Sequence, residues 1–262
     1  MKFFKRILKS MLSIFILLYI SLFLIGIFVS DYLIFQPPGL SYDNSPSITL
    51  INGQDGGKIA LRYLKKLGAK RVILLSHGNA EDLGDIEVWQ EKIGSLGFDV
   101  VAYDYSGYGL SSGSPSEKVV YENIEDVYNY LIDDKGYKPE EIIVWGRSLG
   151  GGPSIWLASQ KKVGALILQS TYTSTFRVMT KIKILPFDKF DNLSRVPKVT
   201  APTLIIHGRL DQVIPFSHGE KLYQTLECNK EFLWLSEAGH NDITFVDPEL
   251  YYTKVTEFLE IN

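Results

Sequence analysis

Short, continuously apolar runs recur along this chain, and they constrain its fold more than any other feature. The runs are Val72–Leu75, Val100–Tyr103, Ile142–Trp145, Ala165–Leu168, Leu204–Ile206 and Phe232–Leu235. Uninterrupted runs of this length are typical of parallel strands that are buried on both faces of a sheet. Segments with helical periodicity lie between several of them, at Asp85–Leu96, Tyr121–Ile132, Gly151–Ala158 and Phe216–Leu226, and Pro248–Leu259 closes the chain. The alternation predicts right-handed strand–helix–strand units and a doubly wound, mostly parallel sheet.

Two further runs, Ile48–Ile51 and Ile59–Tyr63, flank a Gly56-Gly57 turn and predict a hairpin before the parallel strands. A chain of 262 residues suits one α/β domain, which we expect over residues 47–262. The longest gap between strands, Thr171–Pro202, has room for a short helix near Thr173–Lys181. This gap predicts a minimal cap over the sheet.

The N-terminus predicts a membrane anchor. The 21 residues from Ser10 to Ser30 carry no charge and follow four basic residues within positions 1–9. That length spans a hydrocarbon core of about 30 Å at about 1.5 Å per residue. A cleaved signal peptide is the alternative, but its apolar region is shorter and ends in small residues, whereas the first alanine here is Ala60. We therefore expect a transmembrane helix over 10–30 and a linker over 31–46.

The charges around this stretch predict its orientation. The basic residues precede it and Asp31 follows it. By the positive-inside rule, we expect a cytoplasmic N-terminus and a catalytic domain on the far side of the membrane. The net charge of −3 leaves no basic footprint for nucleic acid. Cys228 is the single cysteine, so no internal disulfide is possible and the compartment stays undecided.

Gly146-Arg147-Ser148-Leu149-Gly150 directly follows an apolar run and precedes a helical segment. A G-x-S-x-G turn in this position raises a nucleophilic serine above the sheet at a helix N-terminus, where the dipole favours developing negative charge. The chain reverses within one residue, which forces Ser148 into a strained conformation. Side chains in place of Gly146 and Gly150 would collide with the neighbouring strand and helix. The alternative is a glycine-rich turn with an incidental serine.

Serine is a weak nucleophile at neutral pH, so it needs a base and an orienting acid. The order along the chain with this turn is nucleophile, acid, base. Asp211 and His240 each follow a later apolar run, in loops where such groups belong. We expect Asp211 to be the acid and His240 the base, with Asp242 and Asp247 as weaker alternatives for the acid.

The other histidines fit other roles. His207 lies inside an apolar run and is expected to be buried, His218 lies in a helical pattern, and His77 is expected to hold its loop. That loop, Ser76-His77-Gly78-Asn79-Ala80, follows an early strand and supplies the second oxyanion donor. We expect the backbone N–H groups of Leu149 and Asn79 to form the oxyanion hole.

Three segments in order resemble one group of proteins. They are Ser76–Ala80, Asp104-Tyr105-Ser106-Gly107-Tyr108-Gly109 and Gly146–Gly150. Together they resemble the membrane-associated α/β-hydrolase domain-containing proteins, which include eukaryotic protein depalmitoylases and many bacterial homologues. The resemblance covers roughly Ser47 to the C-terminus and implies an α/β-hydrolase fold with the same triad and oxyanion donors. The depalmitoylases have a lipidated, cysteine-rich N-terminus, and this chain has an apolar stretch without cysteine there.

These residues predict a membrane-anchored serine hydrolase that cleaves carboxylic ester or thioester bonds through an acyl-enzyme. No metal or organic cofactor is implied, and an aspartate nucleophile of the dehalogenase kind is excluded by Ser148. The short cap predicts an open site for substrates near the bilayer, such as lipid esters or acylated proteins. Two alternatives remain: a serine peptidase acting on small peptides, and a non-catalytic, membrane-anchored binding module on the same fold.

Overall fold

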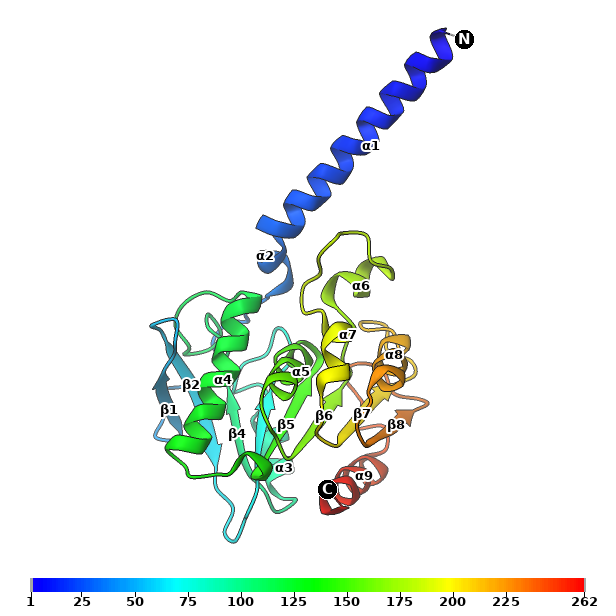
Figure 1. Cartoon of the computed structure of the whole chain (residues 1–262). Helices are drawn as coiled ribbons and strands as arrows, with labels where there is room; N and C mark the ends of the chain where they lie inside the picture. The colour runs from blue at the N-terminus through cyan, green and yellow to red at the C-terminus, as the bar shows by residue number, and fades with distance from the viewer. Residues whose placement is uncertain (1, 262) are drawn as a thin grey trace.

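The computed structural model describes residues 2–261, and within this range the chain forms an eight-stranded sheet with helices on both faces (Figure 1). The strand order is β1-β2-β4-β3-β5-β6-β7-β8. The strands are β1 (Ile48–Asn52), β2 (Lys58–Leu64), β3 (Val72–Ser76), β4 (Asp99–Tyr103), β5 (Ile142–Arg147), β6 (Ala165–Gln169), β7 (Thr203–Gly208) and β8 (Lys230–Leu235). The first two form the predicted antiparallel hairpin, and neighbours from β4 to β8 run parallel. The predicted doubly wound, mostly parallel sheet is confirmed.

The helices carry the same numbering as in Figure 1. They are α1 (Lys2–Phe28), α2 (Ser30–Ile34), α3 (Glu87–Gly94), α4 (Glu117–Asp133), α5 (Gly151–Gln160), α6 (Thr175–Thr180), α7 (Asn192–Arg195), α8 (Ser217–Thr225) and α9 (Pro248–Ile261), with 3₁₀ turns at Pro139–Glu141, Ser148–Gly150 and Val196–Lys198. The start of one helix differs from the expected start because a side chain caps it. Helix α4 begins at Glu117 rather than Tyr121 because the Ser116 side chain accepts a hydrogen bond from Val119 N.

Two hydrophobic clusters pack against the sheet, one on each face. Successive residues of a strand point to opposite faces, so Leu74 belongs to one cluster while Ile73 and Leu75 belong to the other. Helices α4, α5 and α8 cover the first face, and α3 and α9 cover the second. This burial on both sides explains why the strands read as uninterrupted apolar runs.

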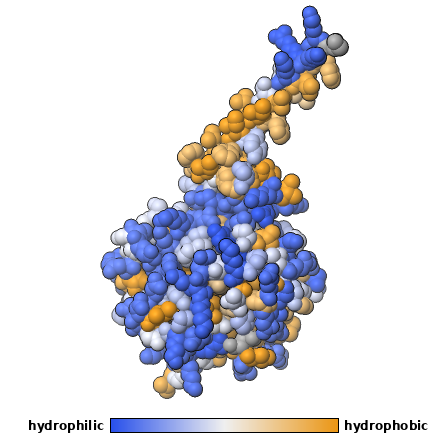
Figure 2. All heavy atoms as spheres, in the orientation of Figure 1, coloured by the Kyte–Doolittle hydropathy of each residue, from blue (hydrophilic) through white to orange (hydrophobic). Residues whose placement is uncertain are grey.

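Helix α1 projects from the body as a long rod (Figure 1). Among residues 2–261, it is the one helix long and apolar enough to cross a membrane, and almost all of its side chains are exposed. Figure 2 shows hydrophobic residues along the rod and hydrophilic ones at its outer end. The helix begins at Lys2, so the basic segment is helical too, and it ends at Phe28 rather than at residue 30.

The segment expected to be a linker is packed against the body. Helix α2 occupies its start, and the buried Phe35 ring packs edge-on against Phe190 with ring centroids 6.0 Å apart. Further along, Ser41 N donates to Asp82 and the Tyr42 hydroxyl donates to Asp104. Residues 31–46 are therefore part of the folded structure.

Candidate active site

Ser148 sits at a sharp turn where β5 leads into α5. Its backbone has a φ of 51°, in the left-handed region that costs a non-glycine residue about 1–3 kcal/mol. A Cβ atom at Gly146 would lie 2.4 Å from Gly150 O, and one at Gly150 would lie 2.2 Å from Ser76 O. Both glycines are required because the backbones approach this closely, as the sequence predicts.

The structure brings Ser148, His240 and Asp211 together from three loops. His240 Nε2 lies 2.9 Å from Ser148 Oγ, and His240 Nδ1 lies 2.8 Å from Asp211 Oδ2. An ionised carboxylate can only accept a hydrogen bond, so the ring proton belongs on Nδ1. The lone pair of Nε2 then faces the serine hydroxyl, as a general base requires.

The Asp211 carboxylate is fixed in place by its surroundings. Its Oδ1 accepts hydrogen bonds from Val213 N at 2.9 Å and Ile214 N at 2.8 Å. Burial by itself would raise the pKa of the Asp211 carboxyl, but hydrogen bonds from His207 and His240 outweigh burial and hold that pKa below its usual range. The carboxylate is therefore ionised at neutral pH. His207 is fully buried beside it, as expected from its apolar run.

The Asn79 side chain is committed to the N-terminal segment. Its Oδ1 accepts hydrogen bonds from Gln36 N at 3.0 Å and from the Tyr108 hydroxyl at 2.6 Å, and its Nδ2 donates to Ile34 O at 2.7 Å. Only the backbone N–H of Asn79 can therefore take the predicted oxyanion role. The other predicted donor, Leu149, starts the turn into α5, where Tyr172 donates its hydroxyl to the Leu149 carbonyl at 3.1 Å.

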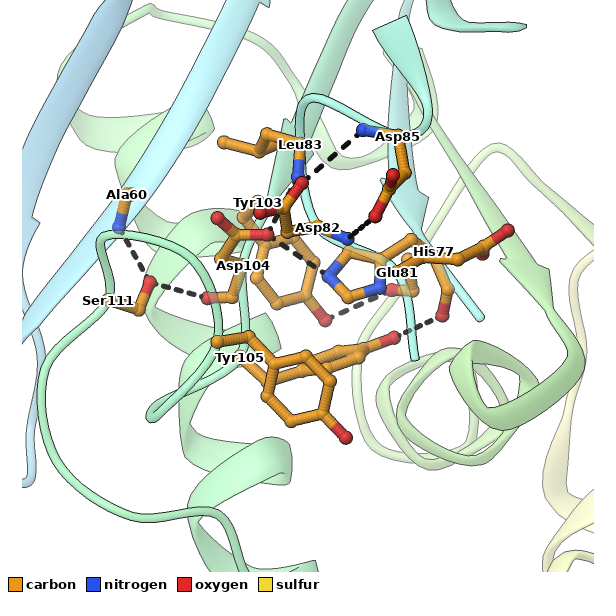
Figure 3. A network of polar contacts seen from close by, with 12 residues as sticks. Ala60, His77, Glu81, Asp82, Leu83, Asp85, Tyr103, Asp104, Tyr105 and Ser111 are labelled. Carbon is orange, nitrogen blue, oxygen red and sulfur yellow. Dashed lines mark hydrogen bonds and ion pairs between the residues drawn. The ribbon is translucent and has the colours of Figure 1, made fainter. Parts of the chain in front are cut away.

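A buried polar network that includes His77, Asp104 and Tyr105 holds the loop that contains Asn79 (Figure 3). His77 Nδ1 donates to Gly78 O at 2.7 Å, and the Tyr105 hydroxyl donates to His77 O at 2.6 Å. Burial alone would lower the pKa of His77, but the nearby Asp104 carboxylate more than compensates and raises it. These contacts fit the structural role expected for His77.

The sequence is similar to known α/β hydrolases. A model of the alpha/beta hydrolase fold matches residues 71–195. Alpha/beta hydrolase domain-containing protein 17B of Homo sapiens is 43% identical over 193 residues, which cover 72% of this chain and 67% of that protein. The chain belongs to the α/β-hydrolase family. Protein 17C of Xenopus tropicalis is 44% identical over 179 residues, which cover 67% of this chain and 58% of that protein.

Solved structures agree with this α/β-hydrolase fold. An esterase from Pyrococcus furiosus superposes with a TM-score of 0.71 at 22% identity, over 86% of this chain and 98% of that one. Likeness at that identity shows the fold alone. Membership of the family confirms the predicted fold and the predicted enzyme class, a serine hydrolase.

The contacts of Arg147 form a polar bridge between loops that could not be predicted from the sequence of this α/β-hydrolase. Arg147, the residue before Ser148, pairs with Glu81 and donates to Asn241 Oδ1 at 3.0 Å. Glu81 in turn accepts a hydrogen bond from Gly78 N at 2.8 Å. The bridge ties the loops that hold Asn79, Ser148 and His240 to one another. No motif signals it, because the x position of G-x-S-x-G accepts many residue types.

The residues of this bridge, Glu81, Arg147 and Asn241, also line a groove next to Ser148 and His240. It has a volume of about 740 Å³ and combines apolar side chains such as Trp89 and Ile243 with charged ones such as Asp85 and Lys92. Among residues 2–261, no three His, Cys, Asp or Glu side chains gather as metal ligands would. Cys228 is partly buried, with its Sγ 3.5 Å from Thr203 Oγ1, away from the triad.

Proposed function

We propose that this hydrolase is anchored in a membrane and cleaves carboxylic ester or thioester bonds with Ser148 as its nucleophile, His240 as its base and Asp211 as the orienting acid. The observation that supports it most is the hydrogen-bonded chain from Ser148 Oγ through both ring nitrogens of His240 to a carboxylate, at 2.9 and 2.8 Å. Proximity on this scale is what general-base activation of a hydroxyl requires.

The reaction runs in two steps. His240 Nε2 takes the Ser148 proton while Oγ attacks the acyl carbonyl, and the resulting oxyanion accepts hydrogen bonds from the N–H groups of Leu149 and Asn79. His240 then gives its proton to the departing alcohol or thiol, which leaves an acyl group on Ser148. In the second step His240 deprotonates a water molecule, which attacks the acyl-enzyme. The bond between the acyl carbon and Ser148 Oγ then breaks, the carboxylic acid leaves, and His240 returns the proton to Ser148 Oγ.

The membrane anchor in this proposal is α1. Its apolar side chains face outward along the length of the helix, and its basic residues lie at the outer end. Those charges support a cytoplasmic N-terminus and a catalytic body on the opposite side. Because the group that the sequence resembles includes protein depalmitoylases, we propose substrates held at the same membrane, either acylated proteins or lipid esters.

A fluorophosphonate probe tests the nucleophile on the full-length protein in detergent or nanodiscs. We expect covalent labelling of wild type, loss of labelling in Ser148→Ala, and unchanged labelling in Ser194→Ala, which removes an exposed serine of the cap. Hydrolysis of p-nitrophenyl esters, a matched thioester and a peptide amide then ranks the bond types. Folded wild-type protein that takes no label, or that cleaves the amide alone, would overturn the proposal.

Protease protection in sealed vesicles tests the orientation. With the N-terminus on the outside of inverted vesicles, the catalytic body should survive added protease until detergent is present. Digestion without detergent would place the body on the cytoplasmic side and refute the proposed topology, while the bond chemistry would stand.

A further inference from the structure

The last turns of α1 pack against the cap instead of standing free. A Cβ atom at Gly26 would lie 2.8 Å from Leu185 Cδ1 and 3.0 Å from Phe187 Cζ, so glycine permits the close contact. One turn earlier, Phe23 meets Phe187 edge to face, with ring centroids 5.4 Å apart. These contacts join the membrane-side helix to the segment that caps the sheet.

Polar contacts fix the same junction at two points. Lys189 Nζ donates to Asp31 Oδ1 at 2.8 Å and to Asp31 Oδ2 at 2.9 Å, and this ion pair links α2 to the cap. A few residues later, the hydrogen bond from Asn79 Nδ2 to Ile34 O links the N-terminal segment to the oxyanion loop. The end of the anchor is thus bonded both to the cap and to the loop beside the nucleophile.

An apolar cavity of about 310 Å³ lies between these elements. One wall comes from α1 and α2, with Leu22, Ile25 and Ile34, and the opposite wall comes from the cap, with Phe176 and Leu185. Its surface is almost entirely apolar, and its size lies within the range of about 300–1,000 Å³ that small-molecule sites occupy. In Figure 1, α2 and α6 lie near the end of α1 that meets the body, and residues of all three helices line the cavity.

The cap edge of this cavity resembles a membrane–water boundary. Met179, Ile182 and Ile184 expose their apolar side chains, and Lys181 and Lys183 lie between them. Apolar side chains alternating with lysines suit the headgroup region, where long cationic side chains reach the phosphates. With α1 in the bilayer as proposed, the cavity would open at the level of the lipid headgroups.

We propose that this cavity holds the fatty acyl chain of the substrate, which enters it laterally from the bilayer, so that the anchor helix itself forms one wall of the substrate site. The inference rests on the proposed function and deepens it, because it commits the enzyme to long-chain acyl esters or thioesters. Ile34 lines the cavity, and its carbonyl oxygen accepts a hydrogen bond from Asn79 Nδ2, so this wall of the cavity lies beside the loop that holds Asn79. The wider, charged groove near Arg147 then receives the leaving group.

A matched pair of tryptophan variants tests this inference. Ile25 lines the cavity and is 45% exposed, whereas the adjacent Leu24 is 47% exposed, points elsewhere and does not line it. In full-length protein in nanodiscs, the ratio of kcat/KM for the hexadecanoyl ester to that for the butanoyl ester reports chain recognition. Each methylene displaced by the new indole lowers this ratio roughly fourfold. We expect Ile25→Trp to lower it at least tenfold and Leu24→Trp to leave it at the wild-type value.

The outcomes separate the inference from the proposed function. Equal ratios in both variants, with wild type hydrolysing esters, would overturn the acyl cavity and leave the serine hydrolase intact. No ester hydrolysis and no fluorophosphonate labelling of wild type would overturn both.

A second measurement locates the chain directly. A hexadecyl fluorophosphonate with a terminal diazirine is attached to Ser148 and irradiated. Cross-links within residues 22–34 or 175–188 support the cavity, whereas cross-links within 241–252 or capture of lipid alone contradict it.

Discussion

Replacing Asp211 with asparagine changes one atom of the triad and should nearly abolish activity. Asp211 Oδ1 accepts two backbone N–H bonds, from Val213 and Ile214. An asparagine must keep its oxygen in that place, since an amide NH₂ cannot accept them. The NH₂ group would then face His240 Nδ1 across the 2.8 Å that now separates that nitrogen from Oδ2.

Two donors cannot share that contact, so the imidazole must carry its proton on Nε2 instead. Nε2 would then point a hydrogen at Ser148 Oγ and could no longer accept the serine proton. In triad enzymes, forcing this tautomer costs about 10⁴-fold in kcat, which corresponds to about 5.4 kcal/mol of transition-state stabilisation. We expect kcat of Asp211→Asn to fall about 10³- to 10⁴-fold. The oxyanion hole would account for the activity that remains.

The assay is hydrolysis of p-nitrophenyl butyrate, paired with urea unfolding to show that the variant is folded. Asp242→Asn is the matched control, because Asp242 accepts a hydrogen bond from Gly239 N at 2.7 Å in the same loop as His240. We expect this control to keep kcat within about threefold of wild type, since surface-loop substitutions outside the triad perturb little. A folded Asp211→Asn protein with more than a tenth of wild-type activity would refute the reasoning.

Two further predictions concern stability. A methyl group at Gly146 would meet the backbone of Gly150 at 2.4 Å, so Gly146→Ala should cost about 3 kcal/mol in urea unfolding; Gly39→Ala, where nothing lies within 4 Å, should stay within about 0.5 kcal/mol. Burial, together with nearby positive charge, lowers the pKa of His218 to about 4. Because the unfolded chain takes up this proton at about pH 6.5, acidification from pH 7 to 5 should cost about 1 kcal/mol after solvent screening. His218→Asn, which keeps an acceptor for Thr173, should remove that part of the pH dependence, and an unchanged slope would contradict it.

The sheet and the convergence of the triad could be predicted from sequence because both depend on local patterns. Uninterrupted apolar runs identify parallel strands, and the carboxyl ends of parallel strands meet at one edge. A residue just beyond a strand, such as Asp211 or His240, is therefore carried to that edge whatever its distance in the chain. The glycine requirement at Gly146 is also local, since it follows from the reversal of the chain within one turn.

The bridge through Arg147 and the packing of the N-terminal segment could not be predicted in this way. Arg147 meets Glu81 and Asn241 only because three loops have already converged, and each of these residues alone is a common surface type. Phe35 and Tyr42 lie on either side of Gln36-Pro37-Pro38-Gly39, a stretch typical of a linker, and only the folded body supplies their partners. Contacts that form only after several loops have come together produce no periodic pattern in the sequence.

The hydrogen bonds of Asn79 to Ile34 and Gln36 make residues before the first strand part of the folded body. A protein that began at the first strand would keep Ser148, Asp211 and His240 but would lack the residues that brace the loop of Asn79. In the membrane arrangement that we propose, the hydrophobic rod lies in lipid and the globular part lies in water, and the two belong to one folded unit. Detergent or lipid is then part of its native environment even for measurements on the chemistry alone.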